Sequence, residues 1–376
     1  MFANISNQEV DAMVIGAGPA GSVTAGEIAK RGFNVLLIEK DDFPGQTNVC
    51  AGGIERWVVD DFKLGGIVEK EILRSKYHFP WGVEEYEADA ATVKREVFDN
   101  FLARKAEAAG VQLLTNTVAL DVIRDDDYLK VNIKNRREEI GDIIKTKLVV
   151  FADGPNTLAK KFGIGFEIRP DTVAESSIFE IEWKNNPLDG YDFFFSPDIS
   201  PWGYGWIFPK RDTLNIGVWC LYSKFQRNIY DCLKDFLSNL GTSIKEKRIV
   251  RFTSALIPLV PAREVYGERM LVVGDAAGMV DSFFGGGISY AIQGAKIAGK
   301  VALDALEEGI FSRDFLSAYQ KEWERTVDYM NIKKMYHLSN VFLPVYRIDR
   351  NIFSKMIGIG LNKRGMMRKL LYRNKL

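Results

Sequence analysis

The side chains best suited to chemistry in this chain stand where apolar runs end or in loops rich in glycine. Asp153 and Asp275 close two apolar runs, and each is flanked by a glycine. Cys50 precedes an alanine and two glycines. Carboxylates can accept hydrogen bonds from sugar hydroxyls, whereas the thiol could donate a proton, act as a redox partner or merely fill space. These residues predict a sugar-containing ligand bound at the ends of buried strands.

A phosphate-binding signature stands near the N-terminus. An apolar strand leads into a G-x-G-x-x-G turn made by Gly16, Gly18 and Gly21, and an alanine-rich helix is expected over residues 22–31. The first glycine permits the tight turn, the second lets a pyrophosphate approach the backbone, and the third lets helix pack on strand. The next strand ends at Glu39, which can accept bonds from ribose hydroxyls. This βαβ unit predicts a bound dinucleotide.

The two distant aspartates decide which dinucleotide is bound. NAD and FAD share the first motif, but Asp275 ends its strand where a ribityl hydroxyl could be bonded. A helix expected to begin near Gly286 would direct its N-terminal N–H groups at the flavin N1/C2 region. The three segments together predict FAD.

The middle of the chain changes from helix–strand alternation to apolar/polar alternation between about residues 166 and 252, which predicts antiparallel strands. Aromatic residues stand at alternate positions in one of them, so they share one face: Trp202, Tyr204, Trp206 and Phe208. Gly203 and Gly205 leave the opposite face bare. Either this is an ordinary core strand, or a long apolar ligand or the flavin ring presses against it.

These motifs resemble a known family. The three segments resemble the flavoprotein hydroxylases of the p-hydroxybenzoate hydroxylase fold group. Within that group, the stretch P-W-G-Y-G-W-I-F-P at 201–209, the loop at 50–53 and the loop at 283–288 are similar to geranylgeranyl reductases. The resemblance implies an FAD enzyme that reduces isolated double bonds of prenyl chains, as in archaeal ether lipids or the chlorophyll side chain.

Two departures separate the chain from the hydroxylases of this fold. Gly278 stands where they usually have histidine, and Asp281-Ser282-Phe283 stands where proline is usual. The Asp-Gly segment continues with Asn156 and Lys160, where serine and arginine are usual. Both departures weaken a nicotinamide-dependent hydroxylase assignment and leave FAD binding intact.

The resemblance also implies roles for particular residues. Arg95, in a helix expected over 92–109, would contact the dinucleotide, unless it is an ordinary solvated helix arginine. The cofactor-binding residues implied are Gly16, Gly18, Ala20, Gly21, Glu39, Lys40, Cys50, Ala51, Gly52, Arg95, Val118, Asp153, Gly154, Asp275, Gly286, Gly287 and Ile288. The substrate-binding residues implied are Tyr204, Trp206, Phe208, Pro209, Phe284 and Gly285, and the catalytic ones are Cys50, Tyr204 and Trp206.

Reduction of an unactivated alkene needs a hydride from flavin N5 and a proton, and positive charge builds at the more substituted carbon. The rings of Tyr204 and Trp206 could stabilise that charge by about 1–2 kcal/mol in a dry site. Cys50, Tyr204 and an ordered water are all candidates for the proton source, with Cys50 first. Flavin monooxygenases or halogenases, and a quinone-linked electron-transfer flavoprotein, are the alternative functions.

The amino-acid composition restricts the kinds of binding partner that this chain can have. Lys+Arg and Asp+Glu are equal at 50 each, so the charge does not favour nucleic acid. Three cysteines indicate a reducing compartment and are too few for a four-cysteine iron–sulfur cluster, so an external electron donor is expected: ferredoxin, a deazaflavin or NADPH. With only His78 and His337, no histidine-rich metal site is expected.

The C-terminal residues 347–376 carry nine bases and one acid, interleaved with apolar residues. This is compatible with a basic amphipathic helix on an anionic membrane, or with a packing helix whose charged face is solvated. No transmembrane run or secretory signal is apparent, so a cytoplasmic location is expected, with possible peripheral contact on the inner face of the cell membrane.

The predicted fold is α/β, with a Rossmann-like FAD-binding domain, an inserted antiparallel-sheet substrate domain and a C-terminal helical region. The FAD-binding domain is discontinuous and comprises 1–75, 89–165 and 253–306, the substrate domain 76–88 and 166–252, and the helical region 307–376.

Overall fold

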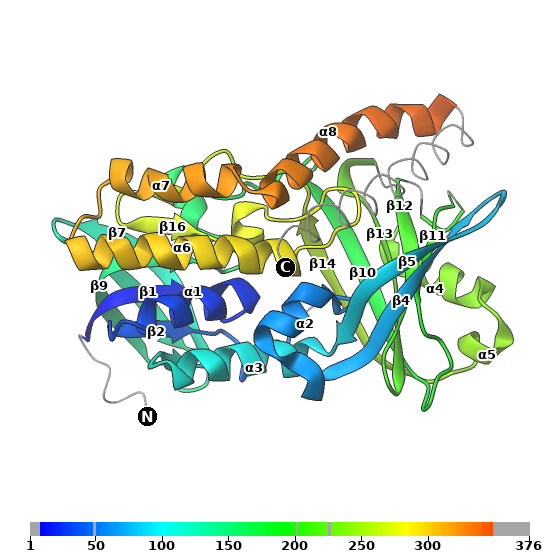
Figure 1. Cartoon of the computed structure of the whole chain (residues 1–376), viewed down its shortest axis with the longest axis horizontal. Coiled ribbons are helices and arrows are strands. Elements are labelled where there is room, and N and C mark those ends of the chain that lie inside the picture. The colour runs from blue at the N-terminus through cyan, green and yellow to red at the C-terminus, as the bar shows by residue number, and fades with distance from the viewer. Residues whose placement is uncertain (1–7, 48–49, 197, 201, 225–226, 349–376) are drawn as a thin grey trace.

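The computed structural model describes residues 8–47, 50–196, 198–200, 202–224 and 227–348. Two sheets stand at opposite ends of an elongated molecule, and long helices cover the first of them (Figure 1). The predicted α/β class with a Rossmann-like FAD domain and an inserted antiparallel sheet is confirmed.

The first sheet is built on a parallel core because short apolar strands are buried on both faces. Its main path runs β15-β16-β9-β1-β2-β6, with the bounds Tyr266–Gly267, Met270–Val272, Gly141–Phe151, Glu9–Ile15, Val35–Ile38 and Gln112–Leu114. A hairpin of β7 (Thr117–Asp125) and β8 (Tyr128–Asn135) extends the sheet by pairing with β9. The parallel strand ends at Ile15, Ile38, Phe151 and Val272 carry the predicted glycine and acid segments.

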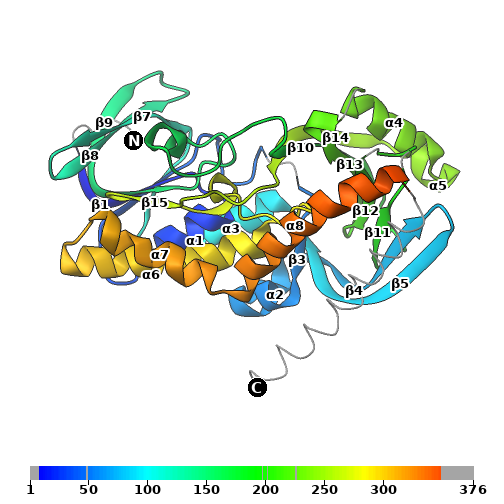
Figure 2. The ribbon, with the colours of Figure 1, turned by 90° about the horizontal axis from the view of Figure 1, so that it is seen from above.

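Helices α1 (Pro19–Ala29), α3 (Arg95–Ala108) and α6 (Ile288–Glu308) pack together on one face of this sheet (Figures 1 and 2). α7 (Arg313–Glu324) packs outside α6. α1 begins before the predicted residue 22 because Pro19 pre-sets the first helical turn. α3 begins at Arg95, later than the predicted residue 92, because Thr92 and Val93 are paired in strand β5.

The second sheet follows the order β14-β10-β13-β12-β11-β4-β5-β3, and all neighbours are antiparallel except β11 and β4. Its strands are Ile249–Pro258, Val173–Glu182, Thr213–Leu221, Gly203–Pro209, Tyr191–Phe194, Val68–Phe79, Gly82–Val93 and Gly53–Glu55, in that order. The domain boundaries proposed from the sequence at 75/76 and 252/253 fall inside β4 and β14, both of which lie wholly in this sheet.

The two faces of the second sheet differ. One face packs against α4 (Ile229–Asn239), with α5 (Thr242–Lys245) beside it. The other face is aromatic and meets the loop containing Ala51 and the loop containing Phe283 and Phe284. The aromatic face therefore looks toward the FAD-domain loops.

The remaining described elements are short, apart from one long helix. They are α2 (Arg56–Phe62) and 3-10 helices at Leu64–Gly66, Leu158–Phe162, Tyr222–Lys224 and Gly274–Ala277. Helix α8 (Val327–Ile348) contacts α6 and α7 and runs on toward the second sheet (Figures 1 and 2). In the described part of the chain, no helix is both long and apolar enough to cross a bilayer. Most of the basic segment 347–376, from residue 349 onward, lies outside the described residues.

Candidate active site

The glycine turn after β1 is held by close backbone approaches. A Cβ on Gly16, whose φ is +99°, would lie 2.4 Å from the carbonyl oxygen of Ala152. A Cβ on Gly21 would lie 1.9 Å from the carbonyl oxygen of Gly16. Both distances are far below any van der Waals contact, so these two positions require glycine.

Gly18 is glycine for a different reason. It is the N-cap of α1, its φ and ψ are −67° and −177°, and no side chain caps the helix there. No described heavy atom beyond its chain neighbours lies within 4 Å of the place where its Cβ would stand. The uncapped N–H groups at this helix end are therefore open to an anion.

The three predicted segments adjoin one another. Gly16 packs on the Ala152–Asp153 backbone at the end of β9, and the methyl of Ala20 lies 2.9 Å from the Cβ position of Gly274. One ligand can therefore touch all three segments.

Glu39 holds the glycine turn in place. Its carboxylate accepts the N–H of Ala17 at 3.0 Å and the N–H of Asp41 at 3.1 Å. Burial raises the pKa of this carboxyl, and the two backbone N–H bonds oppose the rise. The neighbouring Lys40 is exposed, and the half-buried Val118 lies in β7 next to Thr117, whose N–H donates to the Glu39 carbonyl. The sequence proposed a ribose contact for Glu39, and this anchoring role would accompany it.

The two carboxylate oxygens of Asp153 differ in their hydrogen bonding. Oδ2 accepts the N–H of Leu158 at 2.8 Å, while Oδ1 is buried without a hydrogen-bond partner among the described residues. Burial raises the pKa of this carboxyl. Gly154 beside it has φ +79° and open space at its Cβ position. A buried acceptor without a partner is costly in the free protein and suits a ligand donor.

Asp275 lies beside the N-terminus of α6. Its Oδ1 would stand 3.4 Å from a Cβ on Gly287, which is the N-cap of that helix and provides no side-chain cap. Burial raises the pKa of the Asp275 carboxyl, and the Arg95 guanidinium opposes the rise. Gly286 is exposed with an open Cβ position, and Ile288 begins the helix. α6 therefore begins two residues after the predicted Gly286, and the contact of its N-terminus with the flavin stays a prediction.

The Arg95 side chain is largely shielded from solvent, so the alternative of a solvated helix arginine is wrong. Its side chain is 15% exposed and makes a bidentate pair with Asp99, with both N–O distances 2.7 Å. Burial alone would lower its pKa, but the charge of Asp99 and a hydrogen bond with Cys50 raise it, so the guanidinium stays protonated. Arg95 thus bonds the Cys50 thiol and its charge also acts on the Asp275 carboxyl, and its contact with the dinucleotide stays a prediction.

The Cys50 loop rests on the second sheet. Gly52, with φ +78°, would place a Cβ 2.1 Å from the Val93 carbonyl oxygen, so the backbone there is tightly packed. Ala51 packs against the aromatic cluster, and the Cys50 side chain is half-buried. The loop therefore places a thiol between Arg95 and the aromatic face.

Asn215, which the sequence did not single out, connects the loop to the aromatic strand. Its Oδ1 accepts the indole N–H of Trp206 at 2.8 Å. Its Nδ2 donates to Glu180 at 3.1 Å and approaches the Cys50 carbonyl at 3.5 Å. Lys210, only 5% exposed, pairs with Glu180 at 3.2 Å. Glu180 and Asn215 are polar residues within strands that are otherwise largely apolar, and this is the sequence signal that could have identified them.

The aromatic strand β12 has its bare side filled by the protein itself. A Cβ on Gly205 would lie 2.9 Å from the ring of Phe236, which belongs to α4. The expectation that a ligand or the flavin ring presses on this glycine side is therefore wrong, since α4 occupies it. Any ligand must meet the opposite, aromatic side.

That aromatic side is closed by polar contacts at both ends. The Tyr204 hydroxyl donates to the carbonyl of Phe284 at 2.6 Å, and burial raises the pKa of this phenol. At the other end, the Phe208 ring would be 2.9 Å from a Cβ on Gly53, and the carbonyl of Pro209 accepts the Thr92 hydroxyl at 2.8 Å. Of the predicted substrate residues, Tyr204, Trp206, Phe208 and Phe284 therefore share one wall, while Pro209 follows Phe208 in β12 and Gly285 follows Phe284 in the loop.

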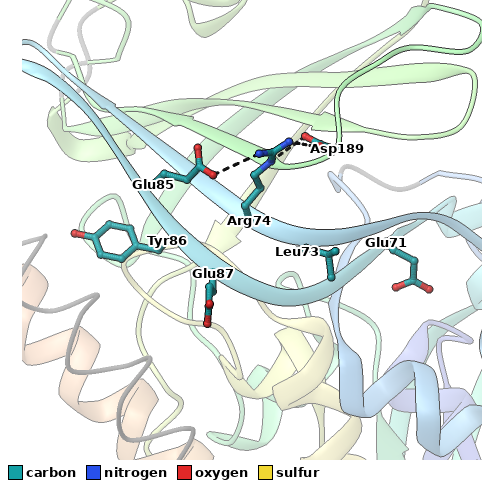
Figure 3. Close-up of a pocket in the computed structure, with 7 residues that line it drawn as sticks. All are labelled: Glu71, Leu73, Arg74, Glu85, Tyr86, Glu87 and Asp189. Atoms are coloured by element: carbon teal, nitrogen blue, oxygen red, sulfur yellow. Dashed lines mark hydrogen bonds and ion pairs between the residues drawn. The ribbon is translucent and has the colours of Figure 1, made fainter.

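A surface hollow of about 560 Å³ lies elsewhere, on the β4–β5 hairpin (Figure 3). Arg74 forms ion pairs there with Glu85 and Asp189. The lining is Glu71, Leu73, Arg74, Glu85, Tyr86, Glu87 and Asp189. Four carboxylates make this hollow unsuited to a hydrocarbon chain.

The fold and the site together define a dinucleotide-binding flavoprotein. The open Gly18 backbone, the free Asp153 oxygen and the α6 end with Asp275 fit the pyrophosphate, a hydroxyl-bearing group and the flavin end of FAD, respectively. The FAD binding domain family matches residues 9–330, so the predicted cofactor is confirmed.

Comparison with known proteins shows which family of flavoproteins the chain belongs to. A digeranylgeranylglycerophospholipid reductase of Methanocaldococcus jannaschii is 32% identical over 339 residues, covering 86% of this chain and 85% of that protein. The solved structure of a geranylgeranyl bacteriochlorophyll reductase-like protein from Thermoplasma acidophilum has a TM-score of 0.85 at 21% identity, covering 94% and 92%. The chain belongs to the FAD-binding family of digeranylgeranylglycerophospholipid reductases.

Flavin-dependent halogenases share the fold. The structure of a flavin-dependent brominase has a TM-score of 0.70 at 21% identity, covering 95% of this chain and 100% of that one. This similarity concerns the backbone arrangement alone, since one fold can host several chemistries.

Proposed function

We propose that this protein is an FAD-dependent reductase that saturates isolated C=C bonds of geranylgeranyl chains in a lipid precursor. One observation carries the proposal: the aromatic face of the second sheet looks toward the loops that contain Cys50 and Phe284. Its other face is filled by α4. A hydrocarbon chain would thus find apolar walls only on the side where FAD is held.

Bound FAD, when reduced, supplies the hydride that adds to one carbon of the double bond. The proton for the second carbon is assigned to Cys50, the first of the candidates named from the sequence. Its thiol lies within hydrogen-bonding reach of Arg95. The S–H bond breaks as the new C–H bond forms, and the thiolate left behind faces a guanidinium until solvent returns a proton.

The aromatic residues position the chain and stabilise charge. The Tyr204 hydroxyl already donates its hydrogen bond to the carbonyl of Phe284, and its raised pKa keeps the phenol neutral. Tyr204 is therefore a poorer proton donor than Cys50. Trp206 is fixed by Asn215. Their rings can stabilise the developing carbocation by about 1–2 kcal/mol because water is excluded.

The electron donor and the location complete the proposal. Each saturated bond consumes two electrons, so reduced FAD must be regenerated by an external donor: ferredoxin, a deazaflavin or NADPH. Because the substrate is a membrane lipid precursor, we place the protein in the cytoplasm with peripheral contact at the inner face of the membrane.

The test is Cys50→Ser, with Cys232→Ser as the control. Cys232 lies in α4 and is buried in the core on the other face of the second sheet, away from the aromatic face. Each protein is loaded with FAD, reduced without oxygen and given a geranylgeranyl lipid, and product mass is followed. We expect Cys50→Ser to keep FAD and to slow reduction about 100-fold, the usual scale of general-acid catalysis. The control should retain its rate. Equal rates in the two variants would exclude Cys50 as the proton donor.

A further inference from the structure

The hairpin of β4 and β5 ends in an exposed apolar tip. Only Pro80 and Trp81 connect the strands, since Phe79 pairs with Gly82. Trp81 is 43% exposed and Val83 58%. Of the seven tryptophans, all within the described residues, Trp81 alone is exposed. A large exposed apolar group at a projecting tip is costly in water unless it contacts another apolar phase.

Aromatic rings connect this tip to the proposed reaction site. Trp81 stacks on Phe79 with ring centroids 4.8 Å apart, and Phe79 stacks on Phe195 at 5.5 Å. Phe195 then contacts Tyr204 at 5.3 Å. Tyr204 is bonded to Phe284 beside the FAD-domain loops. An apolar track therefore runs from solvent to the wall that would hold the substrate.

We propose that the tip formed by Pro80, Trp81, Gly82 and Val83, behind which Phe79 is buried, inserts into a lipid bilayer and is the entrance for the prenyl chain. The entrance role rests on the proposed function, whereas insertion does not. Tryptophan favours the membrane interface because its ring is apolar and its N–H remains hydrated. The hairpin tip and the end of α8 lie at the same end of the molecule in both views (Figures 1 and 2).

The charges near the tip predict the kind of binding. Glu84 and Glu85 follow Val83 directly, so an anionic surface is not attracted to this element. Insertion should therefore be apolar, largely independent of salt and effective on zwitterionic lipid. Binding through basic residues would show the opposite behaviour, requiring anionic lipid and low salt.

The experiment measures co-sedimentation of the FAD-loaded protein with phosphatidylcholine vesicles at low and high salt. Trp81→Ser should weaken binding about tenfold, the scale for withdrawing a large apolar side chain from hydrocarbon. Ile123→Ser is the control, since Ile123 is 44% exposed on β7 of the other sheet. Quenching of Trp81 emission by brominated lipid, taken as the difference from Trp81→Phe, should report its depth.

The outcomes separate the two proposals. Vesicle binding that is about tenfold weaker in Trp81→Ser and unchanged in Ile123→Ser supports insertion at the tip. Undiminished binding of Trp81→Ser, or binding that needs anionic vesicles and disappears in salt, overturns it. If vesicles bind but no prenyl chain is reduced, the proposed function fails while insertion stands. If both hold, Trp81→Ser should slow reduction of vesicle-embedded lipid far more than that of a short, dispersed prenyl substrate.

Discussion

The Gly18→Ala variant should change the affinity for FAD without lowering the stability of the FAD-free protein. Gly18 has φ −67° and ψ −177°, an extended conformation that alanine adopts without strain. No described atom beyond its chain neighbours lies within 4 Å of the added methyl. The FAD-free protein should therefore keep its stability or gain about 0.4–1 kcal/mol, because alanine restricts the unfolded chain.

The same methyl would stand where a pyrophosphate approaches the N-terminus of α1. Losing one or two charge-assisted hydrogen bonds there costs about 2–4 kcal/mol, which corresponds to about 30- to 1000-fold weaker FAD binding. Gly21→Ala is the contrasting variant, since its methyl would lie 1.9 Å from the Gly16 carbonyl oxygen and disturb the protein itself.

The assay is FAD titration by fluorescence, together with thermal unfolding of the FAD-free proteins. We expect Gly18→Ala to unfold at or slightly above the wild-type temperature and to bind FAD weakly, and Gly21→Ala to be destabilised before any FAD is added. Wild-type FAD affinity in Gly18→Ala would refute the assignment of this backbone to the pyrophosphate.

Two further predictions concern buried polar groups. Burial raises the pKa of Asp275 above its ordinary 3.8, so the charged carboxyl disfavours the FAD-free fold at neutral pH. Asp275→Asn should therefore raise the unfolding temperature of the FAD-free protein at pH 7, by an amount that shrinks as pH falls through that pKa. It should also weaken FAD binding about tenfold in titration, and unchanged affinity would remove Asp275 from the flavin site. Asn215→Leu should cost about 2–4 kcal/mol in denaturant unfolding, because Trp206 and Glu180 lose their partner. It should lower kcat for prenyl reduction with FAD affinity unchanged, and a wild-type kcat would show that Asn215 does not position the site.

Local patterns were sufficient to predict the FAD-binding elements. The glycine turn, its helix and the acids at strand ends depend on contacts between neighbours in sequence or on repeated strand ends in one sheet. Gly21 is required by its distance to the Gly16 carbonyl within the turn, and Gly16 by the close approach of Ala152 at the end of the neighbouring strand β9. The aromatic alternation in β12 likewise predicted one aromatic face correctly.

Contacts between residues far apart in the chain could not be predicted from the sequence. The role of Gly205 could not be derived from β12, because the ring that covers it, Phe236, lies in a helix 31 residues further along the chain. Asn215 and Glu180 face each other only through the register of β10 and β13. The burial of Arg95 could not be predicted from Asp99 four residues later, because this spacing is equally typical of an exposed helix pair.

The central claim is that reduced FAD in this protein delivers its electrons to an unactivated prenyl double bond. Its most direct test is a single turnover without oxygen, following flavin absorbance and lipid mass in the same sample. We expect one double bond saturated for each FAD reoxidised. Flavin that stays reduced beside an intact geranylgeranyl lipid, yet reoxidises when oxygen or a quinone is admitted, would contradict the account.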